Sequence, residues 1–96
     1  MLVVITYDVS TTSEGGKKRL RKVAKTCQKY GIRVQNSVFE CIVDSTKLKQ
    51  LKYELNAVIN EKEDSLRVYR LGDNYKGKVE HIGTKEVVNM EEVIII

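Results

Sequence analysis

The residue best placed to carry chemistry is Asp8. It directly follows the apolar run Leu2–Tyr7 and precedes a polar, glycine-containing stretch, Ser10–Gly16. Ligand sites in α/β proteins favour the carboxyl ends of strands, and a carboxylate is an oxygen ligand of the kind that Mg²⁺ and Mn²⁺ prefer. The position also suits an aspartate that caps the loop through its own backbone. Position alone leaves both interpretations open.

A single carboxylate does not complete a metal site. Mg²⁺ takes octahedral oxygen ligands, usually one or two carboxylates together with waters and phosphate. A twofold homodimer with Asp8 near its axis would supply two carboxylates from one sequence position. A metal held in this way would activate water and polarise a phosphodiester. We therefore expect half a site per chain.

The remaining candidates for chemistry are few. The single histidine, His81, has no Ser-His-Asp set, HExxH motif, P-loop or GxGxxG motif beside it, so we interpret it as structural. Cys27 and Cys41 are isolated, without the CxxC spacing of a zinc site. Both fall on expected apolar faces, and we predict that they are buried.

Basic residues are concentrated in one segment. The formal net charge is +4, and no acidic residue interrupts the run Lys17, Lys18, Arg19, Arg21, Lys22, Lys25, Lys29 and Arg33. A localised positive field favours a polyanionic partner, although a solvated lysine-rich helix face has the same pattern. On the exposed side such residues would neutralise phosphates without reading sequence. Arg19 and Arg33, if they point toward Asp8, would stabilise charge on a phosphate being cleaved.

Hydrophobic periodicity gives the elements that position these residues. Strands alternate with two amphipathic helices, and Gly31 stands where a helix C′ glycine belongs. The first expected elements are a strand Leu2–Tyr7 buried on both faces and a helix Lys17–Tyr30. A strand pair within Ile32–Val43, broken at Asn36 and Ser37, follows. The last expected elements are a helix Lys47–Asn60 capped by Asp44, a strand Leu66–Leu71 and a short edge strand Val79–Ile82.

This order predicts an α+β, ferredoxin-like βαββαβ sandwich, with the short extra C-terminal strand exchanged or paired across a homodimer. Residues 1–96 would form one domain, whose tail from about residue 84 contacts the dimer or a partner. The apolar end Val93–Ile96 would pack on the dimer or add a strand to a partner, unless it is a disordered end. No signal peptide or membrane span is visible, so we expect a cytoplasmic protein.

Three stretches resemble one known family. They are Leu2–Ser10, Lys18–Lys25 and Tyr30–Cys41. The shared pattern is an apolar strand ending in Tyr-Asp, a basic helix, and then Gly-x-x-Val-Gln-x-Ser-Val-Phe-Glu. The chain resembles the second CRISPR-associated protein family, and Val68–Leu71 and Val79–Gly83 are similar to that family's last two strands.

The resemblance implies a ferredoxin-like homodimer in which the last strand pairs with the partner's sheet. It implies a role in CRISPR adaptation, where the dimer bridges copies of the integrase (Cas-one) and holds double-stranded DNA. Several family members are metal-dependent endonucleases that act on DNA or RNA. The family's metal-binding aspartate falls on Asp8, and its functional arginines and phenylalanine fall on Arg19, Arg33 and Phe39.

Three functions follow as alternatives. The first is an Mg²⁺- or Mn²⁺-dependent endonuclease that cleaves DNA, with RNA as a second substrate, and serves adaptation. The second is a non-catalytic DNA-binding scaffold of the integrase complex. The third, a small-molecule-binding regulator of the same fold, would leave the basic helix unexplained. In either of the first two, we expect that removal of residues 91–96 weakens integrase binding more than it weakens the dimer.

Overall fold

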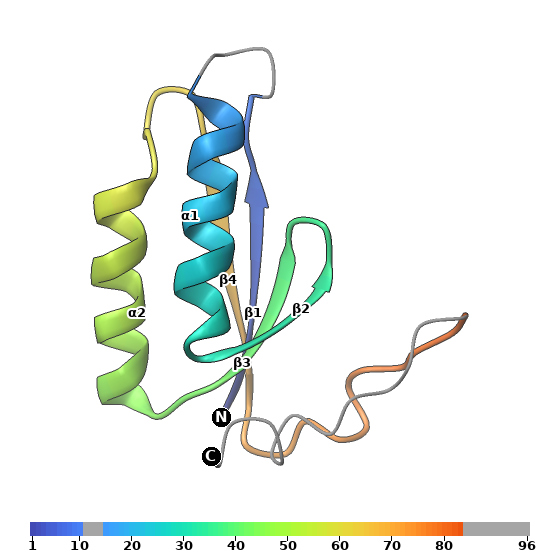
Figure 1. Cartoon of the computed structure of the whole chain (residues 1–96). Coiled ribbons are helices and arrows are strands. Elements are labelled where there is room, and N and C mark those ends of the chain that lie inside the picture. The colour runs from blue at the N-terminus through green and yellow to red at the C-terminus, as the bar shows by residue number, and fades with distance from the viewer. Residues whose placement is uncertain (11–14, 84–96) are drawn as a thin grey trace.

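The structure is a computed structural model that describes residues 1–10 and 15–83. A four-stranded antiparallel sheet of order β2-β3-β1-β4 carries two helices on one face (Figure 1). The elements are β1 (Leu2–Asp8), α1 (Gly16–Gln28), β2 (Gly31–Gln35), β3 (Val38–Ile42), α2 (Ser45–Val58) and β4 (Ser65–Gly72). This arrangement confirms the predicted ferredoxin-like α+β fold.

The core lies between the sheet and the helices. Alternate residues of β1 face inward, and Ile5 pairs with Phe39 across β1 and β3. Both predicted helices are amphipathic, with one buried face each. The predicted burial of the two cysteines, which are free thiols, is also confirmed. The buried cluster comprises Val3, Ile5, Tyr7, Val23, Ala24, Cys27, Phe39, Cys41, Val43, Leu48, Leu51 and Leu55. Burial of these apolar side chains is the main stabilising contribution to the fold.

The outer face of the sheet is only partly covered. Val4 and Thr6 lie on this face and are half-buried, whereas Val3, Ile5 and Tyr7 are fully buried against the helices. The prediction of a first strand buried on both faces is therefore wrong for the single chain. The reason is that both helices pack on the same side of the sheet (Figure 1).

Gly31 is a second correction. Among the described residues only Gly72 and Gly83 have positive φ, so Gly31 is not the left-handed residue of a helix C-cap. It begins β2, where its backbone crosses close to β3. A Cβ atom at this position would overlap the backbone of Glu40 and Cys41. Glycine is needed here for close approach rather than for backbone conformation.

The predicted short strand at Val79–Ile82 does not form within the single chain, and its expected pairing across a homodimer stays a prediction. This segment, which includes His81, has no regular secondary structure, and the Ile82 side chain is 92% exposed. A strand requires a neighbouring backbone to accept and donate its hydrogen bonds, and no described strand of this chain pairs with the segment. The predicted tail, including Val93–Ile96, lies outside the described residues.

The start of α2 follows the sequence prediction. The Asp44 side chain accepts a hydrogen bond of 2.8 Å from the backbone N–H of Lys47, which is an N-cap. No such side-chain cap is formed at the start of α1. Neither described helix has the length and apolar character needed to cross a membrane.

Candidate functional site

Asp8 is the last residue of β1, and its side chain is exposed. It lies on the outer face of the sheet, opposite Ser65 of β4. No hydrogen bond to its carboxylate comes from residues 1–10 or 15–83. The described part of the loop therefore does not form the backbone cap that was the alternative interpretation. The carboxylate oxygens face solvent, where an ion or a polar ligand can reach them.

The described residues of one chain do not supply a complete metal site around Asp8. Within the described ranges, no group of three or more His, Cys, Asp or Glu residues is placed to hold a metal ion. Glu63 and Asp64 lie at the same end of the sheet, but both form ion pairs with Arg19. Asp8 thus fits an Mg²⁺ or Mn²⁺ ion as one oxygen ligand, and the residues that the structure describes place no second free carboxylate beside it.

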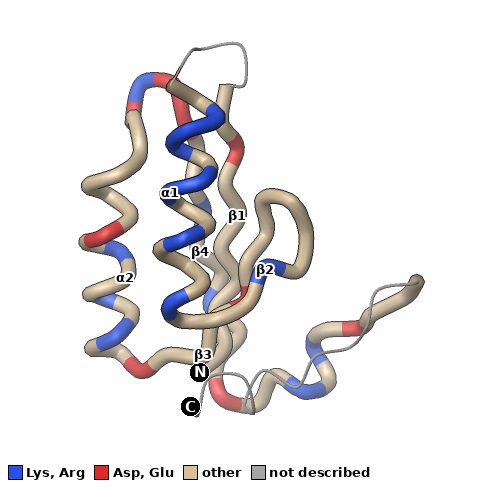
Figure 2. Tube along the Cα trace, viewed as in Figure 1, with Lys and Arg blue, Asp and Glu red and all other residues tan. Residues whose placement is uncertain are grey.

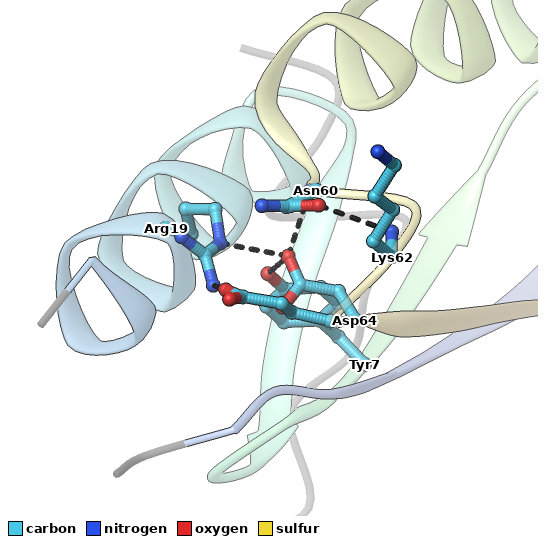
Figure 3. A network of polar contacts seen from close by, with 6 residues as sticks. Tyr7, Arg19, Asn60, Lys62 and Asp64 are labelled. Atoms are coloured by element: carbon cyan, nitrogen blue, oxygen red, sulfur yellow. Dashed lines mark hydrogen bonds and ion pairs between the residues drawn. The ribbon is translucent and has the colours of Figure 1, made fainter. Parts of the chain in front are cut away.

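Arg19 is held inside a polar network (Figure 3). Its Nε atom donates to Asp64 Oδ2 at 2.8 Å, and one terminal nitrogen donates to Glu63 at 2.8 Å. The hydroxyl of Tyr7 donates to the same Asp64 oxygen at 2.6 Å. Arg19 therefore faces the turn before β4, and no hydrogen bond or ion pair joins it to Asp8.

The network shifts the pKa values of its members. Burial, reinforced by the hydrogen bond to Asp64, raises the pKa of Tyr7 to about 12. Burial alone would raise the pKa of Asp64, but hydrogen bonds from Arg19, from Tyr7 and from the backbone N–H of Asn60 hold it below its usual value. At neutral pH the network therefore contains an ionised Asp64, a charged Arg19 and a neutral Tyr7.

The other predicted basic residues of α1 lie on its solvent face. Lys17, Lys18 and Arg21 are exposed, as are Lys22 and Lys25. Figure 2 shows basic residues along the whole length of this helix. We call Lys17, Lys18, Arg21, Lys22 and Lys25 the basic face of α1. It points away from the sheet, whereas Asp8 lies on the opposite side of the sheet.

Arg33 and Phe39 have different surroundings. Phe39 is fully buried in the core, opposite Ile5. The exposed Arg33 donates from Nε to the backbone oxygen of Asn36 at 2.7 Å, and its guanidinium lies 5.7 Å from the centre of the Phe39 ring. This distance is typical of a cation–π contact. Neither residue forms a hydrogen bond or an ion pair with Asp8.

Comparison with known proteins decides the family. The sequence model of the family described as CRISPR associated protein Cas2 matches residues 1–79. The chain belongs to the Cas2 family.

Individual members of the Cas2 family agree with this assignment. The chain is 68% identical over 95 residues, 99% of each chain, to a protein of Halalkalibacterium halodurans named CRISPR-associated endonuclease Cas2. It is 51% identical over the full length of both chains to a protein of Chlorobaculum tepidum named CRISPR-associated endoribonuclease Cas2. The crystal structure of Streptococcus pyogenes Cas2 superimposes with a TM-score of 0.79 at 52% identity, covering 86% of this chain and 100% of the other.

Sequence reasoning placed Asp8 correctly at the end of the first strand but missed Asp64. Residues 61–64 have the composition of a solvated turn, and their pairing with α1 is not visible locally. The one available signal was Tyr7. Strand periodicity places it on the buried face, and a buried tyrosine hydroxyl usually needs a hydrogen-bond partner. In this Cas2 chain that partner is the carboxylate that precedes the last described strand.

Proposed function

We propose that this chain is a metal-dependent endonuclease that cleaves phosphodiester bonds of double-stranded DNA, with RNA as a second substrate, and works in CRISPR adaptation. The exposed Asp8 carboxylate carries the proposal because it stands at the carboxyl end of β1 with no described hydrogen-bond donor. The names of the Halalkalibacterium halodurans and Chlorobaculum tepidum relatives, an endonuclease and an endoribonuclease, support a nuclease activity.

In this proposal Asp8 binds Mg²⁺ or Mn²⁺, and the chain acts as a homodimer. The partly covered outer face of the sheet supports the dimer, because a second copy would bury Val4 and Thr6 further. We propose that the twofold axis passes close to Asp8, so that one carboxylate from each chain would reach the same ion. When bound, the metal supplies a water nucleophile and charge stabilisation at the scissile phosphate. The protein contributes the carboxylate ligands and the position of the nucleic acid.

The basic face of α1 would bind the nucleic acid. Lys17, Lys18 and Arg21 are exposed and form no ion pair with any residue that the structure describes, so they are available to phosphate oxygens. Arg33 is exposed on β2 and would contribute a further positive charge. Binding of this kind depends steeply on salt and weakly on base sequence.

A second candidate function follows from the lack of a metal-binding cluster in the described residues, which hold no group of three metal-binding side chains. A non-catalytic dimer that binds double-stranded DNA and the CRISPR integrase does not need such a cluster. The basic face of α1 serves this scaffold equally well. The two functions differ in whether the chain cleaves phosphodiester bonds, a reaction for which the nuclease needs Asp8.

The deciding experiment is a cleavage assay on matched DNA and RNA duplexes with Mg²⁺, with Mn²⁺ and with chelator. Asp8→Asn keeps the shape of the side chain and removes its charge, and Lys49→Ala on the exposed side of α2 is the control. The nuclease proposal expects wild type and Lys49→Ala to cleave with either metal, and Asp8→Asn to lose at least about a hundredfold in rate. Equal cleavage by Asp8→Asn would refute it, whereas duplex binding without cleavage by the wild type would favour the scaffold.

A further inference from the structure

Asp64 connects three parts of the chain that are far apart in sequence. Its side chain is 0% exposed. It accepts hydrogen bonds from the Tyr7 hydroxyl at 2.6 Å, from Arg19 Nε at 2.8 Å and from the backbone N–H of Asn60 at 2.9 Å. The three donors come from β1, from the beginning of α1 and from the turn that follows α2 (Figure 3). Asp64 is therefore the common hydrogen-bond acceptor of the three donors. We call Tyr7, Arg19, Asn60 and Asp64 the junction.

The junction adjoins Asp8 on two strands. Tyr7 immediately precedes Asp8 on β1, and Ser65, which follows Asp64, pairs with Asp8 across β1 and β4. The hydrogen bond between Tyr7 and Asp64 thus fixes the neighbours of Asp8 on both strands. Because a displacement of about 1 Å can reduce a catalytic rate by about a hundredfold, the position of this strand end matters for any chemistry at Asp8.

The same junction holds the beginning of α1. Arg19 is one residue after Lys18 and is anchored to Asp64 through two donor atoms, Nε at 2.8 Å and a terminal nitrogen at 3.2 Å. A phosphate that took over these donors would leave the ionised, fully buried Asp64 without its cation. Removing one partner of a buried ion pair is strongly unfavourable. Phosphate binding by Arg19 therefore competes with the fold itself.

We propose that Asp64 is the positioning residue of the candidate site, and that Arg19 acts through Asp64 and does not bind phosphate. The inference rests on the proposed function, since it concerns how Asp8 and the basic face of α1 are held for the same nucleic acid. Tyr7 is the third member of this positioning unit. Lys17, Lys18 and Arg21 remain the phosphate-binding residues.

Salt dependence of duplex binding separates positioning from direct contact. Each phosphate contact contributes about 0.9 to the slope of log Kobs against log salt. Lys18→Gln should lower the slope by about that amount. Arg19→Gln should weaken binding at any one salt concentration but leave the slope at the wild-type value. A fall of the Arg19→Gln slope equal to that of Lys18→Gln would overturn the inference.

The sign of the effect at Asp64 gives a second test. On charge alone, Asp64→Asn should strengthen binding of a polyanion, because it removes a negative charge. Positioning predicts the opposite, a loss of about threefold or more in duplex affinity, and little further loss when Arg19→Gln is added to Asp64→Asn. Tighter binding by Asp64→Asn, or independent and additive effects of the two substitutions, would contradict the proposal.

Cleavage kinetics complete the design, with circular dichroism to confirm folding of each variant. Tyr7→Phe removes only the hydroxyl, and it replaces Asp64→Asn as the test variant if Asp64→Asn does not fold. Lys49→Ala is again the control. We expect Tyr7→Phe to lower kcat by about tenfold with KM changed less than about threefold, and Arg19→Lys to retain more kcat than Arg19→Gln. If Tyr7→Phe keeps the wild-type kcat while Asp8→Asn is inactive, the inference about Asp64 is overturned but the proposed function is not. A wild type that neither binds nor cleaves nucleic acid overturns the proposed function as well.

Discussion

The hydroxyl of Tyr7 lies 2.6 Å from Oδ2 of Asp64, although 57 residues separate the two in the chain. Tyr7 is also part of the hydrophobic core, where its side chain is buried among the inward residues of β1. Its ring therefore packs with the core while its hydroxyl ends in the polar network beside Asp8. Core packing and the position of the candidate metal ligand depend on the same side chain.

Alkaline unfolding should reveal this hydrogen bond. In an unfolded chain tyrosine titrates near pH 10, whereas burial and Asp64 raise the pKa of Tyr7 to about 12 in the fold. Below pH 10 the contribution is fully present. Between about pH 10 and pH 12 the unfolded chain loses a proton that the folded chain keeps, so stability falls as pH rises, by up to about 1.4 kcal/mol per pH unit.

Tyr7→Phe lacks this titration and is the matched variant. Urea unfolding at several pH values between 9 and about 11 gives the free energy of unfolding of each protein. The wild type should lose stability more steeply than Tyr7→Phe. The contribution of Tyr30, whose pKa is raised to about 12 by a hydrogen bond to Glu54 and by burial, is common to both proteins. Parallel pH profiles would show that the Tyr7 hydroxyl is not protected in the fold.

Phe39 should act on stability rather than on nucleic-acid binding. Its side chain is fully buried between the sheet and the helices, and truncation of a buried phenylalanine costs about 3–5 kcal/mol. We expect Phe39→Ala to lower the urea midpoint by a corresponding amount, and Phe39→Leu to keep most of the wild-type stability and duplex affinity. A Phe39→Leu protein of normal stability that fails to bind duplex would place Phe39 in the nucleic-acid site instead.

Gly31 tests the close approach of β2 to β3. Gly31→Ala adds a methyl group that meets the backbone of Glu40 and Cys41, and overpacking of this kind costs about 1–3 kcal/mol. Gly77→Ala is the control, because nothing lies within 4 Å of a Cβ atom at that position. Urea unfolding should show a clear loss of stability for Gly31→Ala and a change within about 0.5 kcal/mol for Gly77→Ala. Equal effects would exclude a steric role for Gly31.

The sequence predicted the features that depend on local patterns. A continuous apolar run located β1, alternation of apolar residues located β3, and the Asp44 cap located the start of α2, because each signal lies within a few residues of the element. Asp64 was missed because its partners, Tyr7 and Arg19, lie 57 and 45 residues away. The segment Val79–Ile82 forms no strand in the single chain because a strand needs another backbone to pair with, and its expected pairing across a homodimer stays a prediction.

The predictions for Arg19 and Gly31 show a related limit. The sequence pattern predicts that a basic residue on a basic helix lies on the solvent face. Arg19 instead forms ion pairs with two acidic residues from the turn before β4. A glycine after a helix is read as a C-cap, yet Gly31 is required by a neighbouring strand. In both cases the deciding contact comes from a part of the chain that no local pattern identifies.

The central claim is that Asp8 is half of a metal site that a second chain completes. The test is a titration of the purified protein with Mn²⁺ in which electron paramagnetic resonance follows the bound ion. We predict one bound Mn²⁺ for two chains, lost in Asp8→Asn and unchanged in Lys49→Ala. One ion bound per chain, or the same binding in Asp8→Asn, would contradict it.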